Sequence, residues 1–180
     1  LLTIYLAAHH PDRVAKAIVL DAGELHPQVF ALIQPSVQRL GQLYPSWDDY
    51  IAAVKAQPIF GGWWDPAIER YYRADLRTLE DGQVTPRSRP ETIAAASAGV
   101  QAEPWGDLMA AVRQPVLLVN APGAYGPPGA PAVQPEEAGR RTAALMADCR
   151  YVKVPGNHMT MLYGAGAEAI ATAILAFVRD

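Results

Sequence analysis

Short apolar runs alternate with helical patterns at both ends of the chain. Val14–Leu20, Pro115–Asn120 and Arg150–Val154 are bounded by turn residues and predict three buried strands. Around them, apolar residues recur at helical spacing, which predicts helices at Leu1–His10, Asp107–Val112, Glu136–Ala147 and Ala165–Val178. Alternation of strands with helices is typical of a parallel sheet covered by helices.

The middle of the chain has a different pattern, with helical signals in place of strand signals. Val29–Leu43 carries Pro35 and should kink or split there, whereas Ser46 and Asp65-Pro66 are each expected to begin a helix. Glu91–Val100 predicts one more helix. The sequence therefore predicts an α/β fold with a parallel sheet and a helical cap insertion. We expect the core to comprise residues 1–23 and 107–180 and the cap to comprise residues 24–106.

The first residues are unusual for the start of a domain. Leu1–His10 has a wide apolar face, but no methionine and no capping residue come before it. Three strands are also few for a sheet of this kind. We therefore expect that the chain is cut inside an element, or is a fragment that lacks N-terminal strands.

Composition and charge exclude several classes of partner. The chain has 180 residues, 51% of them hydrophobic, and a formal net charge of −3, with no basic stripe that would favour nucleic acid or an anionic membrane. No apolar stretch reaches the roughly 20 residues of a membrane span. The single cysteine, Cys149, excludes an internal disulfide and suits a reducing compartment. We expect a cytoplasmic protein; its oligomeric state is not indicated.

Two polar residues follow buried strands at the edge where α/β folds place their chemistry. Asp21 ends the first predicted strand, and His158 lies just past the third, after Val154, Pro155 and Gly156. An imidazole can accept a proton and return it, and a carboxylate can hold that imidazole in one tautomer. Each residue also has a purely structural interpretation, as a strand-end turn residue or an inert loop histidine.

The order of three segments resembles the α/β-hydrolase superfamily. Leu1–Asp21 resembles the helix after the nucleophile elbow followed by strand six, and Val112–Val119 resembles the entry to strand seven. Val154–Leu162, with Val-Pro-Gly-Asn-His, resembles strand eight and the catalytic histidine loop. The resemblance covers both ends of the chain and implies the C-terminal two-thirds of such an enzyme.

The chain departs from the family pattern in two ways. The elbow Gly-x-Ser-x-Gly is absent, and the four serines are interpreted as cap or loop residues: Ser36, Ser46, Ser88 and Ser97. The loop after strand seven, where the family commonly places its acid, has neither Asp nor Glu between residues 120 and 135. Some family members place the acid after strand six, where Asp21 stands. The resemblance therefore implies an Asp21–His158 pair that serves a nucleophile upstream of Leu1.

The activity that the resemblance implies is acyl transfer to water from an ester, a lactone or a thioester. With an aspartate as nucleophile, the same pair would serve a haloalkane-dehalogenase-like reaction. A non-catalytic relative that binds a small ligand is the alternative from another class, and a truncated, inactive fragment is a third possibility. The enzyme would need its N-terminal half, on the same chain or a separate one, and we expect these residues alone to be inactive.

Weaker candidates are expected to contact the substrate. His26 follows Asp21 on the way into the cap and is a candidate for lining a pocket, although a structural role is favoured. Trp63 and Trp64 belong to an aromatic cap that either packs internally or covers a hydrophobic substrate. Met159 is more readily explained by packing. No pair of histidines and carboxylates has metal-binding spacing, so we expect neither a metal nor a cofactor.

Overall fold

The computed structural model describes all residues from Leu1 to Asp180, and the chain divides into two compact units. The first unit comprises residues 1–27, 103–125 and 129–180, and the second comprises residues 28–102 and 126–128. The sequence predicted a core of residues 1–23 and 107–180 and a cap of residues 24–106. None of the helices combines the length and the apolar character that spanning a membrane requires.

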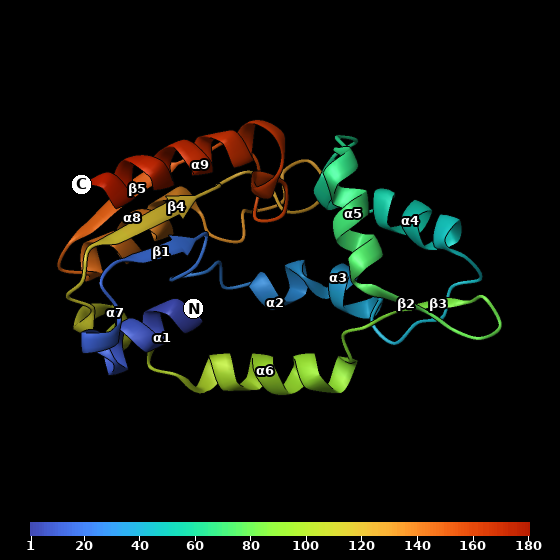
Figure 1. Cartoon of the computed structure of the whole chain (residues 1–180), viewed down its shortest axis with the longest axis horizontal. Helices are drawn as coiled ribbons and strands as arrows, with labels where there is room; N and C mark the ends of the chain where they lie inside the picture. Colours follow the sequence, from blue (N-terminus) through green and yellow to red (C-terminus); the bar gives the residue numbers. More distant parts are fainter. The chain divides into compact units, whose positions relative to one another are not determined.

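The first unit is a three-stranded parallel sheet with helices on both faces (Figure 1). The strands have the order β1-β4-β5. Their bounds are Ala17–Leu20 for β1, Val116–Asn120 for β4 and Cys149–Lys153 for β5. The helices of this unit are α1 (Leu2–His9), α7 (Trp105–Ala111), α8 (Glu136–Leu145) and α9 (Gly164–Arg179), with short 3₁₀ turns at Pro11–Arg13 and Thr160–Leu162.

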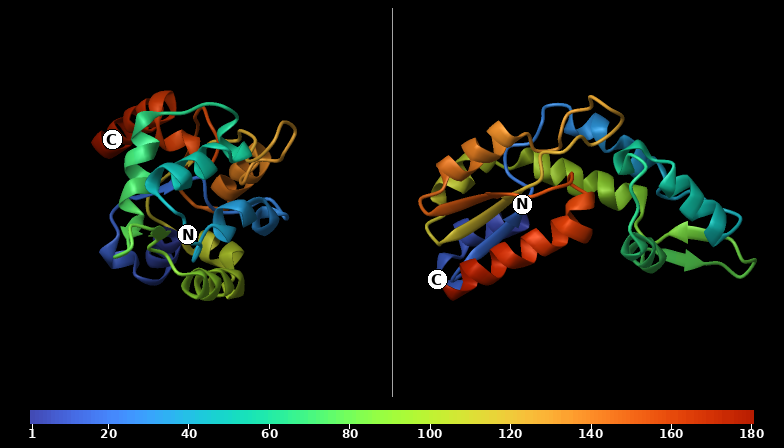
Figure 2. Two further views of the ribbon diagram at one scale, coloured as in Figure 1. Left: turned by 90° about the vertical axis from the view of Figure 1, so that its right-hand side faces the viewer. Right: turned by 90° about the horizontal axis from the view of Figure 1, so that it is seen from above.

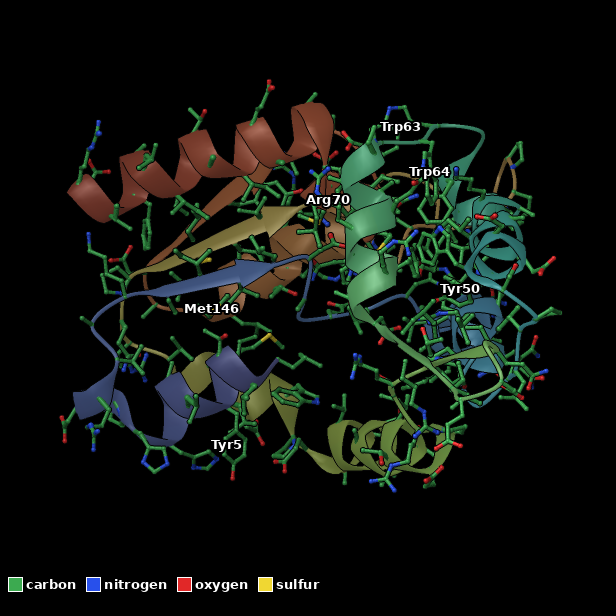
Figure 3. All side chains as sticks on the ribbon, turned by 45° about the vertical axis from the view of Figure 1, so that its right-hand side comes forward. Tyr5, Tyr50, Trp63, Trp64, Arg70 and Met146 are labelled. Atoms are coloured by element: carbon green, nitrogen blue, oxygen red, sulfur yellow. The ribbon has the colours of Figure 1, made fainter.

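The central strand β4 is buried from end to end because both faces of the sheet are covered. Val116 and Leu118 pack with α1 and α7 on one face, whereas Leu117 and Val119 pack with α9 on the other. The two views of Figure 2 show α9 and α8 on opposite sides of the sheet. Each of these side chains contributes about 1.5–3 kcal/mol by its burial. In Figure 3, Met146 lies on the sheet face that carries α1.

Both outer strands differ from their predictions. The strand expected from Val14 begins at Ala17, and the strand expected at 150–154 runs from Cys149 to Lys153. The prediction that this last strand is buried is wrong, because β5 pairs only with β4 and its residues are half-buried or exposed. Cys149 is the first residue of β5 and is half-buried, and this partial burial raises the pKa of its thiol to about 11.

The second unit is mainly helical. Its helices are α2 (Val29–Leu32), α3 (Gln34–Gln38), α4 (Trp47–Lys55), α5 (Pro66–Ala74) and α6 (Pro90–Ala102), with a 3₁₀ turn at Pro58–Phe60. The predicted split at Pro35 is confirmed, because proline lies in the first turn of α3. The predicted caps are also confirmed: Ser46 accepts a hydrogen bond from the N–H of Asp49, and Asp65 accepts one from that of Ala67.

Two features of this unit were not predicted, and one prediction about it is wrong. A short antiparallel hairpin joins β2 (Leu76–Thr78) to β3 (Val84–Pro86), and its turn contains Asp81-Gly82. Ser36 and Ser97, interpreted as cap or loop residues, lie inside α3 and α6. Tyr50 is fully buried, and the Arg39 guanidinium donates both to its hydroxyl at 2.7 Å and to Asp75 at 2.9 Å.

Candidate active site

Asp21 and His158 lie in contact although 137 positions separate them in the chain. Asp21 Oδ2 is 2.9 Å from His158 Nδ1. The carboxylate is only 1% exposed, whereas the imidazole is 43% exposed. A buried carboxylate on one side of a solvent-accessible imidazole is the arrangement in which the acid orients the ring and the far nitrogen exchanges protons.

The backbone at Asp21 has a conformation that suits its position after β1. Its N–H donates to the carbonyl of Val119 on β4 at 2.7 Å, so the residue is still attached to the sheet. Its φ of +49° makes it the one residue other than glycine with positive φ in the chain. Aspartate tolerates this left-handed conformation better than most residues do. The turn directs the chain away from the sheet and leaves the carboxylate at its edge.

Two donors from the end of β4 hold the second carboxylate oxygen of Asp21. Asn120 Nδ2 donates to Oδ1 at 2.8 Å, and the backbone N–H of Ala121 donates to the same oxygen at 2.9 Å. Hydrogen bonds from neutral donors stabilise a carboxylate that is removed from water. Oδ2 is thereby left facing His158.

The loop that carries His158 is fixed by Asn157. Its side-chain oxygen accepts the N–H groups of Met159 and Thr160, both at 3.0 Å, and its amide nitrogen donates to the carbonyl of Ala124 at 2.9 Å. Gly156 precedes it with φ of +99°, where a β-carbon would lie 2.9 Å from the backbone nitrogen of Met161. These contacts make a tight Asx turn that holds the histidine at the sheet edge.

A ring from the loop after β4 also contacts His158. The Tyr125 ring meets the imidazole edge to face, with centroids 6.1 Å apart, and Tyr125 is 6% exposed. Such a contact restricts rotation of the imidazole. Tyr125 could not be selected from the sequence, because it lies in a Gly/Pro-rich loop without periodicity.

Behind Asp21, a buried polar network extends from Asn120. Tyr151 Oη donates to Asn120 Oδ1 at 2.7 Å, and Asn120 Nδ2 also donates to the carbonyl of Gln134 at 2.9 Å. Asn120 and Gln134 are both fully buried. Burial raises the pKa of Tyr151, and the negative charges of Glu136 and Asp21 act in the same direction. The phenol therefore stays protonated at neutral pH.

Sequence reasoning missed this network. One signal was available, since Asn120, like Asp21, is a polar residue at the end of an apolar strand run, Val-Leu-Leu-Val-Asn. For Tyr151 and Gln134 no signal existed, because tyrosine suits any strand and glutamine suits any loop.

The weaker candidates lie in different places. His26 is half-buried, with its N–H donating to the carbonyl of Val133 at 2.8 Å, and Met159 is half-buried beside His158 in the chain. Trp63 and Trp64 belong to the second unit, just before α5 (Figure 3). Trp63 is 43% exposed, and Trp64 packs edge to face on Phe60 at 4.9 Å. Contact of these four residues with a substrate stays a prediction.

No group of three or more His, Cys, Asp or Glu side chains is arranged to hold a metal ion. The expectation of a reaction without metal or cofactor stays a prediction.

Comparison with solved structures identifies the fold. The chain is similar to E-2-(acetamidomethylene)succinate hydrolase with a TM-score of 0.78 and 20% identity, over 98% of this chain and 62% of that one. This chain is part of an α/β-hydrolase fold. The enol-lactonase from Burkholderia xenovorans LB400 is similar with a TM-score of 0.67 and 16% identity, over 99% of this chain and 61% of that one.

A third α/β-hydrolase structure, the thioesterase domain from the curacin biosynthetic pathway, matches with a TM-score of 0.64 and 13% identity. The match covers 97% of this chain and 61% of that one, so the chain spans about three fifths of the α/β-hydrolases it resembles. The predicted fold class, a partial α/β-hydrolase with a parallel sheet, is confirmed. No family model and no curated protein matches the sequence.

Proposed function

We propose that these residues belong to a hydrolase that cleaves an ester, a lactone or a thioester, with His158 as general base and Asp21 as the acid that orients it. The observation that carries the proposal is the 2.9 Å contact between Asp21 Oδ2 and His158 Nδ1. The nucleophile would lie outside these 180 residues, since no serine here occupies a strand–turn–helix elbow. A lactonase and a thioesterase domain are among the proteins of similar fold.

The geometry favours one tautomer of the neutral imidazole. With a carboxylate at Nδ1, that nitrogen carries the proton and donates it, so Nε2 has a free lone pair. Nε2 would accept the proton of the attacking hydroxyl as the nucleophile's oxygen bonds to the carbonyl carbon. The resulting imidazolium would give that proton to the leaving group as the acyl bond breaks. Water would then release the acyl group by the same two steps.

The substrate is proposed to be hydrophobic. This part of the proposal is supported by the aromatic residues of the second unit, which are numerous: Phe30, Tyr44, Trp47, Tyr50, Phe60, Trp63, Trp64, Tyr71 and Tyr72. If the nucleophile were an aspartate, the same pair would serve dehalogenation, and if it were glycine or alanine the protein would only bind its ligand. The residue at the nucleophile position therefore separates these activities.

The test is His158→Ala in a protein that also carries the preceding segment. Hydrolysis of a chromogenic short-chain ester should fall to background, and Asp21→Asn should lower kcat by a factor on the order of 10⁴, as acid-to-amide changes do in other triads. His10→Ala, which removes an exposed histidine at the end of α1, is the matched control and should hydrolyse the ester normally. Full activity in His158→Ala would refute the proposal.

A further inference from the structure

Asn120 occupies a position at which its side chain determines how the Asp21 carboxylate is turned. It ends β4, is fully buried, and donates from Nδ2 to Asp21 Oδ1 at 2.8 Å. The terminal torsion of an aspartate is broad and lacks sharp rotamer wells. The carboxylate therefore depends on its hydrogen-bond partners to keep Oδ2 directed at His158.

The orientation of the Asn120 amide is itself determined by its neighbours. Oδ1 accepts from the Tyr151 hydroxyl at 2.7 Å, while Nδ2 donates to Asp21 Oδ1 and to the Gln134 carbonyl. A flipped amide would place its oxygen against both of those acceptors, which is unfavourable in a buried site. The amide thus has one stable orientation, with its donor toward Asp21.

Tyr151 is in turn held from the surface. Its ring lies under the Arg140 guanidinium at 4.7 Å, and Arg140 pairs with Glu136 at 2.8 Å within α8. The hydroxyl therefore points inward from an anchored ring. Tyr151, Asn120 and Asp21 form a continuous series of hydrogen bonds that ends at His158 Nδ1.

We propose that Asn120, oriented by the Tyr151 hydroxyl, is a positioning residue that fixes the Asp21 carboxylate so that Oδ2 receives the Nδ1 proton of His158. The proposal rests on the proposed function for its catalytic consequence, but the positioning itself is a property of these four side chains. Without the Asn120 donor, only the Ala121 N–H would hold Oδ1. The carboxylate would then rotate, and the imidazole would lose its preferred orientation.

The experiment compares Asn120→Asp, Asn120→Leu and Tyr151→Phe in the protein that carries the preceding segment. Asn120→Asp keeps the side-chain shape and the acceptor for Tyr151, but it replaces the donor with an oxygen that repels Asp21. Tyr151→Phe removes the hydroxyl alone. We expect kcat for the ester to fall roughly 10- to 100-fold in each variant with KM nearly unchanged, since small misplacements of catalytic groups cost about this much.

A second measurement does not depend on turnover. The Nδ1 proton of His158, hydrogen-bonded to a buried carboxylate, should give a downfield proton NMR signal that is lost or shifted in all three variants. Tyr71→Phe, which removes an exposed hydroxyl on α5, is the matched control for Tyr151→Phe and should leave that signal in place. If Asn120→Leu fails to fold, Tyr151→Phe still tests the proposal, because it deletes only one oxygen.

The outcomes separate the two proposals. An unchanged His158 signal in Tyr151→Phe and in the folded Asn120 variants overturns the positioning role, whatever the turnover. A changed signal with a selective fall in kcat supports it. A changed signal together with full ester hydrolysis by His158→Ala supports positioning and overturns the hydrolase proposal.

Discussion

Asp21 combines a backbone role and a side-chain role that can be separated by substitution. Its φ of +49° costs an ordinary residue about 1–2 kcal/mol, and less for aspartate or asparagine. Its Oδ1 satisfies two buried donors, from Asn120 and Ala121. The same residue therefore holds the turn after β1 and supplies the carboxylate to His158.

Asp21→Asn and Asp21→Ala should differ in stability although both lack the carboxylate. The asparagine tolerates positive φ and its oxygen can accept from both donors, so we expect unfolding free energy within about 1 kcal/mol of the parent. The alanine strains the turn and leaves two buried donors unpaired, which should cost about 2–4 kcal/mol. Urea denaturation measures both. Equal losses in the two variants would contradict this division of roles.

The sequence could indicate Asp21 and His158 because each is a polar residue directly after an apolar strand run. In a parallel sheet, such residues meet at one edge, so their proximity follows from topology. Asn120 ends a strand in the same way, but an amide has no acid–base chemistry that would single it out. Its importance lies in the direction of its donor, which depends on Tyr151 and Gln134 and is a property of the folded structure alone.

At the level of elements, helix α8 packs closely against the end of β4 through Gly139. A β-carbon at this position would lie 3.1 Å from both Asn120 Oδ1 and a ring carbon of Tyr151. Both neighbours are held by hydrogen bonds, and Asn120 is fully buried, so neither can move freely. The glycine thus permits the close approach of α8 to the network behind Asp21.

Gly139→Ala should therefore destabilise the protein despite the better helix propensity of alanine. Overpacking is expected to cost about 1–3 kcal/mol, which exceeds the roughly 1 kcal/mol gained from propensity. Gly99→Ala on α6 is the matched control, because nothing lies within 4 Å of its would-be β-carbon, and it should be neutral or stabilising. Urea titration of both variants tests the contrast, and similar changes in both would contradict it.

Elements differ in how far the sequence could predict them. The apolar run of β4 and the capping residues of α4 and α5 are local signals, so these three elements could be predicted from the sequence. The hairpin β2–β3 has three residues in each strand, too few for alternation to be recognised. The limits of β1 and β5 depend on pairing with β4, which no local pattern encodes.

At the scale of the whole molecule, the sheet of the first unit has an open edge at β1. The N–H groups of Ala17, which begins β1, and of Asp21, which follows it, donate toward β4, to the carbonyls of Pro115 at 3.0 Å and Val119 at 2.7 Å. By this alternation the N–H groups of Ile18 and Leu20 point away from β4. An exposed row of backbone donors and acceptors beside an apolar strand favours pairing with a further strand.

The order of elements indicates which strand would pair there. Helix α1 leads through a short turn into β1, and a helix between two parallel strands usually joins neighbours in the sheet. One edge of β1 is occupied by β4, so a strand before α1 would take the other. The proposed nucleophile would then end that strand, at the same sheet edge as Asp21.

Amide hydrogen exchange distinguishes a paired edge from an open one. In the chain of residues 1–180 alone, the amides of Ile18 and Leu20 should exchange rapidly, whereas that of Val19 should be protected by β4. In a protein that carries the preceding segment, all three should be protected, because the added strand accepts the outward N–H groups.

Protection of the Val19 amide is the internal control that the sheet has formed. Rapid exchange of Ile18 and Leu20 in the longer protein would show that no strand pairs with β1, and the nucleophile would then have to reach His158 from another direction.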